Sequence, residues 1–177
     1  MTLHEERLLS SSHLGRHKVQ KTIQLLFLSF LFSISLSAND INIDTLVANA
    51  NGKPLFLFFH KPHCGHCQHM IKFTLGDDEI HKEVAEKFVY VDMFTGDEGV
   101  VSFKNFRGTR RDFAKFLGYD FYPTSIFVDS KNNVVNATPG AREQDYFINV
   151  LNYVSSKQYQ TMEFETYIDT LDFNSDS

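Results

Sequence analysis

Residues 55–67 read Leu-Phe-Leu-Phe-Phe-His-Lys-Pro-His-Cys-Gly-His-Cys, and they are the most informative part of this sequence. The first five form a continuous apolar run, bounded by Pro54 and by Lys61-Pro62. Such a run is typical of a strand that is buried on both faces of a sheet. After Cys67 no helix breaker occurs until Gly76, so we predict a helix that starts near Cys64 and continues to about Leu75.

Cys64 and Cys67 are the two cysteines of the chain, and two residues separate them. A disulfide between them closes a very short loop, so it is a weak structural staple. A redox role explains the spacing better, because a thiol at a helix start faces unpaired N–H groups and the positive end of the helix dipole, which favour the thiolate. We expect Cys64 to be the catalytic nucleophile and Cys67 the resolving thiol.

Histidines surround the cysteine pair at every third position: His60, His63, His66 and His69. We expect His66 to place a donor or a positive charge near the Cys64 thiolate, which makes the disulfide more oxidising; an exposed spacer is the alternative. Two thiolates and these imidazoles also raise the alternative of zinc or copper binding, but the ligand count is unfavourable and we expect no metal. Covalent haem requires C-x-x-C-H, and Gln68 follows Cys67 here. We therefore expect no cofactor.

The rest of the chain alternates between helix and strand patterns. Residues 38–50 suit either a short strand or a short helix and are treated as an N-terminal extension. Residues 93–108 are polar and contain glycines, which predicts a loop. The expected elements are a helix over 77–86, a strand over 88–92, a helix over 109–117, a strand over 124–129, a returning strand from residue 134, a helix through about 156 and an acidic tail over 158–177.

Composition excludes several classes of protein. The chain has 177 residues, a formal charge of −5, 42% hydrophobic residues, 18 Phe and no Trp. This composition does not fit a disordered chain, a collagen-like chain or a scaffold with several disulfides, and it allows one main domain, expected over 51–157. No clustered basic surface is visible after residue 21, so we expect no nucleic-acid partner.

The N-terminal 37 residues have the pattern of a signal peptide. Four basic residues precede an apolar run over 23–36, and Ser35 and Ser37 provide small residues for cleavage after Ser37. A retained membrane anchor is the alternative, but the run is shorter than the roughly 20 residues that span a bilayer. Cleavage leaves an acidic exported domain without stable membrane insertion, in a compartment where cysteines are oxidised.

Further downstream, Tyr122-Pro123-Thr124 enters an apolar strand over 126–128. The order of strand, CxxC, helix and then a proline before a strand resembles the thioredoxin superfamily, over about residues 51–156. The resemblance implies an α/β thioredoxin fold, a central mixed β-sheet flanked by helices, with 93–108 as an insertion before the helix that precedes a cis-proline. It also implies that Pro123 is that cis-proline, and that the backbone of Tyr122 pairs with an incoming substrate strand.

Within the superfamily, the chain resembles periplasmic thioredoxin-like proteins of the SoxW type. It departs from cytosolic thioredoxin at three positions: His63 replaces the Trp before the first cysteine, His66 replaces the Pro between the cysteines, and Phe58 replaces a buried Asp that assists proton transfer. The Gly65-His66 pair is the one seen in protein disulfide isomerases. Deprotonation of Cys67 is therefore left to water, to Lys61 or to a histidine.

The resemblance implies a periplasmic thiol–disulfide oxidoreductase that acts on client proteins. We expect a monomeric reductase supplied by a membrane thiol or electron donor. Two alternatives stay open, a disulfide oxidase or isomerase of the same fold and a non-enzymatic metal carrier. For the carrier, Met70 is the only methionine near the cysteines, and its position in the predicted helix favours packing.

Overall fold

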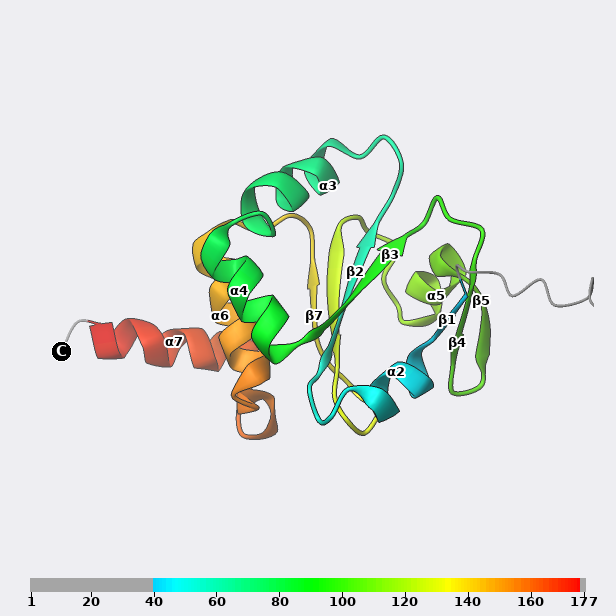
Figure 1. Cartoon of the computed structure of the whole chain (residues 1–177). Coiled ribbons are helices and arrows are strands. Elements are labelled where there is room, and N and C mark those ends of the chain that lie inside the picture. Colours follow the sequence, from blue (N-terminus) through cyan, green and yellow to red (C-terminus); the bar gives the residue numbers. More distant parts are fainter. Residues whose placement is uncertain (1–39, 176–177) are drawn as a thin grey trace, which may run out of the picture. The chain divides into compact units, whose positions relative to one another are not determined.

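The computed structural model describes residues 40–175, so the predicted signal peptide lies outside the described residues. Within this range no helix combines the length and the apolar character needed to cross a membrane. The elements follow one another as β1 (Ile41–Asn42), α2 (Ile43–Asn49), β2 (Leu55–His60), α3 (Gly65–His69), the π-helical segment η1 (Met70–Thr74), α4 (Asp78–Lys87), β3 (Val89–Phe94), β4 (Val100–Phe103), β5 (Phe106–Thr109), α5 (Arg110–Phe116), β6 (Thr124–Val128), β7 (Val134–Pro139), α6 (Gln144–Ser155), the 3₁₀ turn η2 (Gln158–Gln160) and α7 (Phe164–Ser175) (Figure 1).

The main sheet has four strands in the order β3-β2-β6-β7. β2 is parallel to β3 and antiparallel to β6, and β7 is antiparallel to β6, so the predicted central mixed sheet is confirmed. Two parallel neighbours need a crossover connection. The chain makes this crossover through α3, η1 and α4, which places Cys64 just before α3 and Cys67 in its first turn.

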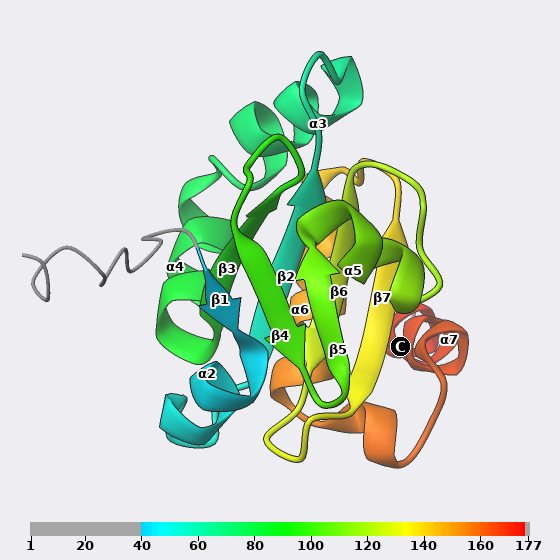
Figure 2. The same ribbon diagram turned by 90° about the vertical axis from the view of Figure 1, so that its right-hand side faces the viewer.

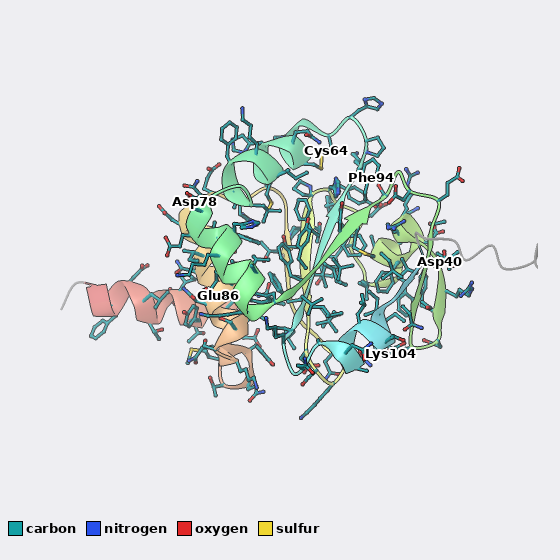
Figure 3. The ribbon with its side chains drawn as sticks, in the orientation of Figure 1. Asp40, Cys64, Asp78, Glu86, Phe94 and Lys104 are labelled. Carbon is teal, nitrogen blue, oxygen red and sulfur yellow. A yellow bond between two sulfur atoms is a disulfide. The ribbon has the colours of Figure 1, made fainter. Side chains whose placement is uncertain are left out.

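Alternate residues of β2 point to opposite faces of the sheet, as the two-residue period of a strand requires. Leu55, Leu57 and Phe59 enter a core with α2, α5 and β4, whereas Phe56 and Phe58 enter a core with η1, α4 and α6. All five side chains are fully buried. Burial of a Phe or Leu side chain contributes about 1.5–3 kcal/mol each, which explains why this strand is uniformly apolar. Figure 3 shows the two layers of side chains.

The prediction of a loop over residues 93–108 is wrong, because this segment contains strands. β3 extends to Phe94, and the hairpin β4–β5 follows, with Lys104 at φ 53° in its turn. Val101 and Phe103 are buried and alternate with half-buried residues, so the segment has a strand period that its polar residues concealed. The hairpin joins β1 in a second sheet of order β1-β4-β5 (Figure 2).

Residues 41–50, expected as an extension, pack into the domain. Ile43 and Val47 of α2 belong to the core. The side chain of Asp40 accepts the Val100 N–H at 2.8 Å, and that of Asp44 accepts the Lys104 N–H at 2.7 Å. These bonds hold the N-terminal segment to the hairpin.

Two helices begin at side chains that cap their first turn. Asp77 accepts the N–H groups of Glu79 and Ile80 at the start of α4, and Thr109 accepts the Asp112 N–H at the start of α5. In the C-terminal segment, Phe164 of α7 is buried and its ring lies 5.3 Å from that of Tyr153. This aromatic contact packs α7 against α6.

Candidate active site

Cys64 and Cys67 form a disulfide, with their Cα atoms 5.2 Å apart. β2 ends at His60, the chain turns at His63 with φ 55°, and α3 begins at Gly65, so Cys64 is the N-cap residue. The Cys67 N–H points at the Cys64 sulfur, 3.1 Å away. Cys64 is 8% exposed and Cys67 is fully buried. Cys64 therefore keeps a small exposed area, and Cys67 has none.

Tyr122 and Pro123 lie beside the disulfide although they follow Cys64 by some sixty residues. The Tyr122–Pro123 peptide bond is cis, as predicted, and Pro123 is buried. The carbonyl oxygen of Tyr122 lies 3.9 Å from the Cys64 sulfur. The Pro123 carbonyl accepts the Gly140 N–H at 2.8 Å, which fixes this turn against the end of β7. The two predicted substrate-binding residues are thus next to the predicted nucleophile.

The residues around Cys64 are exposed or half-exposed, and we call them the front of the site: Lys61, His63, Gly65, His66 and Tyr122. The Lys61 ammonium lies 5.7 Å from the centre of the Tyr122 ring. Burial raises the pKa of the Tyr122 phenol, and the charge of Asp120 adds to this, so the hydroxyl stays protonated at neutral pH. A Cβ atom added at Gly65 would meet no atom within 4 Å. The front is therefore open.

We call Cys67, together with Phe58 and His60 of β2 and Asp92 of β3, the back of the site. Phe58 is fully buried, and its ring stacks on His60 with 5.4 Å between centroids. The Nε2 atom of His60 lies 2.5 Å from a carboxylate oxygen of Asp92 on β3. No carboxylate replaces Phe58, but this histidine–carboxylate pair lies next to it. In the sequence, His60 stands out only as a member of the histidine series, and no pattern marks Asp92.

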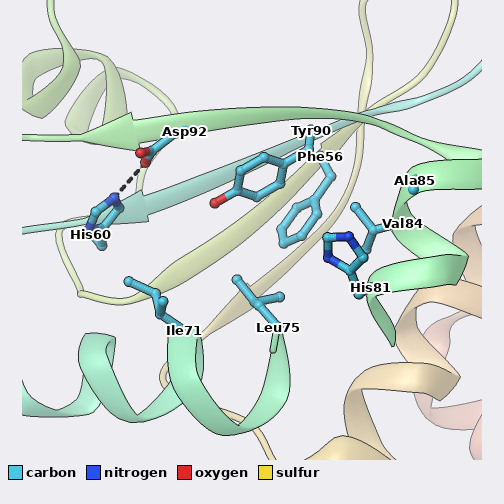
Figure 4. A pocket seen from close by; sticks show the side chains of 9 residues that line it. All are labelled: Phe56, His60, Ile71, Leu75, His81, Val84, Ala85, Tyr90 and Asp92. Carbon is cyan, nitrogen blue, oxygen red and sulfur yellow. Dashed lines mark hydrogen bonds and ion pairs between the residues drawn. The ribbon is translucent and has the colours of Figure 1, made fainter. Parts of the chain in front are cut away.

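A groove of about 380 Å³ runs from the back of the site along the sheet (Figure 4). His60 and Asp92 lie at one end of it and His81 of α4 at the other, while Ile71 of η1 and Leu75, the residue after η1, cover it. Tyr90 of β3 projects into the groove, and burial, with the nearby charge of Asp92, raises the pKa of its phenol.

The histidines around the cysteines do not converge on one point. His63, His66 and His69 are exposed, while His60 is turned towards Asp92. Among residues 40–175, no three His, Cys, Asp or Glu side chains are arranged to hold a metal ion.

Comparison with known proteins identifies the family. The thioredoxin-like domain family matches residues 41–155. Protein disulfide isomerase-like 2-2 of Oryza sativa subsp. japonica is 29% identical over 111 residues, which make up 63% of this chain and 26% of that protein. This chain therefore spans about a quarter of the length of that relative.

Two solved structures have the same fold. A thioredoxin-fold protein from Helicobacter pylori superposes with a TM-score of 0.57 at 20% identity, covering 68% of this chain and 85% of that one. A thioredoxin from Thermus thermophilus gives 0.51 at 22% identity, covering 62% and 78%. Because the family match spans more than half of the sequence and includes both cysteines and Pro123, the chain belongs to the thioredoxin-like family, with the fold and the CxxC pair of a thiol–disulfide oxidoreductase.

Proposed function

We propose that this chain is an exported thiol–disulfide oxidoreductase that reduces disulfides of client proteins in the periplasm. The observation that carries the proposal is the unequal exposure of two disulfide-bonded residues, 8% for Cys64 against 0% for Cys67, beside the cis Tyr122–Pro123 bond. This arrangement suits a nucleophile that meets the client and a second thiol that reacts only within the protein.

The reaction balances as two thiol–disulfide exchanges. The Cys64 thiolate attacks one sulfur of a client disulfide, so a mixed disulfide forms and the first client thiolate leaves. Cys67 then loses its proton and attacks the Cys64 sulfur, which releases the second client thiolate. The client gains two electrons and two protons, and the enzyme is left with the Cys64–Cys67 disulfide.

The front of the site receives the client. An extended client segment pairs with the backbone at Tyr122 beside Pro123, as an added strand does, and its sulfur then lies over Cys64. The carbonyl oxygen of Tyr122, 3.9 Å from the Cys64 sulfur, supports this placement. His63, Gly65 and His66 modulate the reactivity of the exposed sulfur.

The compartment and the partners follow from the N-terminal sequence and the chemistry. The signal-peptide pattern of residues 1–37 supports export, and an oxidising compartment requires a dedicated source of electrons for a reductase. A membrane thiol donor therefore re-reduces the disulfide, in keeping with the resemblance to SoxW-type proteins. The exported chain acts as a monomer.

A disulfide oxidase or isomerase is the second candidate. It is favoured by His66, whose positive form makes the disulfide more oxidising, and by the sequence similarity to a plant protein named as disulfide isomerase-like. Both candidates use the same two exchanges, run in opposite directions.

The deciding experiment is the equilibrium reduction potential of the Cys64–Cys67 pair, measured against a glutathione series on the chain purified after export, with Cys67→Ser as the control. A potential near about −270 mV supports the reductase and one near about −120 mV the oxidase. A pair that does not cycle overturns the oxidoreductase and favours a metal carrier.

A further inference from the structure

His60 has a buried ring nitrogen without a partner. Its side chain is 12% exposed, Nε2 lies 2.5 Å from the Asp92 carboxylate, and Nδ1 is buried with no hydrogen-bond partner among residues 40–175. A carboxylate only accepts hydrogen bonds, so Nε2 carries the proton of this bond. In the neutral ring, Nδ1 then has a free lone pair. Buried polar atoms are nearly always paired, and an exception calls for an explanation.

The ring is held in place from three sides. Phe58 stacks on it with 5.4 Å between centroids, Phe94 lies 4.9 Å away, and Asp92 fixes Nε2. The orientation of the imidazole and its tautomer are therefore set by its surroundings. A carboxylate that orients a histidine in this way is the arrangement by which enzymes prepare a general base.

His60 lies on the side of the sheet that the active-site helix covers. His60 shares the face of β2 with Phe56 and Phe58, and this is the face covered by η1 and α4. Ile71 lines the same end of the groove as His60 (Figure 4). Cys67 precedes Ile71 by four residues, about one helical turn, so it lies on the same side of the helix and nearer to the end of β2.

Other groups are less suited to take the proton of Cys67. Lys61 is turned to the Tyr122 ring, and His63 and His66 are exposed at the front. The titratable groups that line the groove with His60 are Asp92 and Tyr90 from β3 and His81 from α4. Tyr90 keeps its proton because burial raises its pKa, and His81 is exposed at the far end of the groove.

We propose that His60, oriented by Asp92, is the general base for Cys67. When the mixed disulfide has formed on Cys64, the Cys67 thiol gives its proton to Nδ1 of His60, directly or through one water. The Cys67 thiolate attacks the Cys64 sulfur, the bond to the client sulfur breaks, and the client leaves as a thiolate. The imidazolium is stabilised by the Asp92 carboxylate until it returns the proton to solvent. This inference rests on the proposed function.

The two exchanges can be timed separately with dithiobis(nitrobenzoate). One equivalent added to the reduced full-length chain releases one nitrothiobenzoate when Cys64 attacks and a second when Cys67 displaces the mixed disulfide. In His60→Gln we expect the first release to keep its rate and the second to slow about 100-fold at pH 7, since general base catalysis contributes about 10²–10⁴-fold. Raising the pH above about 8.5, where a free thiol ionises, restores the second rate. His81→Gln, at the other end of the groove, is the matched control and keeps both rates.

Asp92→Asn tests the same step without the risk of a lost fold, because the Asp92 side chain is 58% exposed. We expect its second release to slow tenfold or more at pH 7, with the same recovery at high pH. An unchanged second rate in both variants overturns the inference. A loss that affects both releases equally, or persists at high pH, also overturns it, because it shows a structural role. A wild-type chain that never makes the second release instead overturns the proposed function.

Discussion

The front and the back of the site differ in the kind of group that makes the interactions, backbone at the front and side chains at the back. At the front, the groups that form hydrogen-bond contacts with the Cys64 sulfur belong to the backbone, namely the Cys67 N–H at 3.1 Å and the Tyr122 carbonyl at 3.9 Å. At the back, the interacting groups are side chains, namely the ring of Phe58 stacked on His60 and the pair of His60 with the Asp92 carboxylate. In the proposed mechanism, client recognition and attack therefore depend on the backbone around Cys64, whereas resolution by Cys67 depends on the side chains of His60 and Asp92.

Substitution of either cysteine is expected to have the largest effect, because Cys64 reacts at the front and Cys67 at the back. We expect Cys64→Ser to abolish disulfide exchange, whereas Cys67→Ser still attacks and accumulates a mixed disulfide with the client. In the reduced wild type, iodoacetamide should modify Cys64 at least about 100-fold faster than buried Cys67. Mass spectrometry of the trapped species checks both points. Equal alkylation rates for the two cysteines would contradict the claim that only Cys64 is accessible.

The second prediction compares a buried and an exposed residue of the active-site helix by their effect on the free energy of unfolding. Met70 is fully buried at the start of η1, and Gln68 is exposed two residues earlier. Met70→Ala leaves a cavity and should lower the free energy of unfolding by about 2–5 kcal/mol. Gln68→Ala should change it by less than about 0.5 kcal/mol. Urea unfolding followed by circular dichroism measures both. Similar losses in the two variants would show that the helix has no distinct buried face.

The front was largely predictable from the sequence, and the back was not. A CxxC after an apolar run and a proline before a second run are local patterns, so Cys64, Cys67 and Pro123 could be placed without tertiary information. The His60–Asp92 contact joins residues 32 positions apart. It depends on the parallel register that sets Phe58 beside Asp92, and no local pattern fixes that register.

The same reasoning explains what the sequence missed in the fold. β2 and β6 are buried on both faces, so their composition alone identifies them. β4 and β5 have four residues each and are partly exposed, and their polar residues resemble those of a loop. β1 has two residues and gains its pairing from β4, which is about sixty residues away. Such strands are stabilised by tertiary contacts and carry little signal of their own.

A smaller effect concerns His66, which lies between the cysteines on the exposed side. If it stabilises the Cys64 thiolate, His66→Ser should make the reduction potential more negative by tens of millivolts, since about 30 mV corresponds to a tenfold change in the equilibrium constant. His69→Ser, one turn further along the same exposed surface, is the control and should leave the potential unchanged. Equal potentials in all three proteins would make His66 a spacer and leave the front without a side chain that tunes the sulfur.

Substitution of Gly65 tests whether the glycine is needed for the approach of the client or for folding. An added Cβ atom meets nothing within 4 Å, so Gly65→Ala should fold normally and gain up to about 1 kcal/mol through the reduced entropy of the unfolded chain. If the client backbone passes over this position, exchange with a protein disulfide slows a few-fold while the reaction with dithiobis(nitrobenzoate) does not change. Parallel kinetics with the two substrates check this. Loss of stability would instead assign the glycine to the fold.

The smallest expected effect is that of Tyr90, in the groove beside the back of the site, on the pH dependence of stability. Burial first, and then the charge of Asp92, raises the pKa of its phenol above the ordinary value of about 10. Between that value and the folded-state pKa, the unfolded chain loses the proton and the folded chain keeps it, so stability is fully present below about pH 10 and falls as the pH rises. Tyr90→Phe removes this proton, and its urea midpoint should drop less than that of the wild type between about pH 9 and pH 11. An identical drop would show that the phenol is hydrated and that the groove is more open than the back of the site requires.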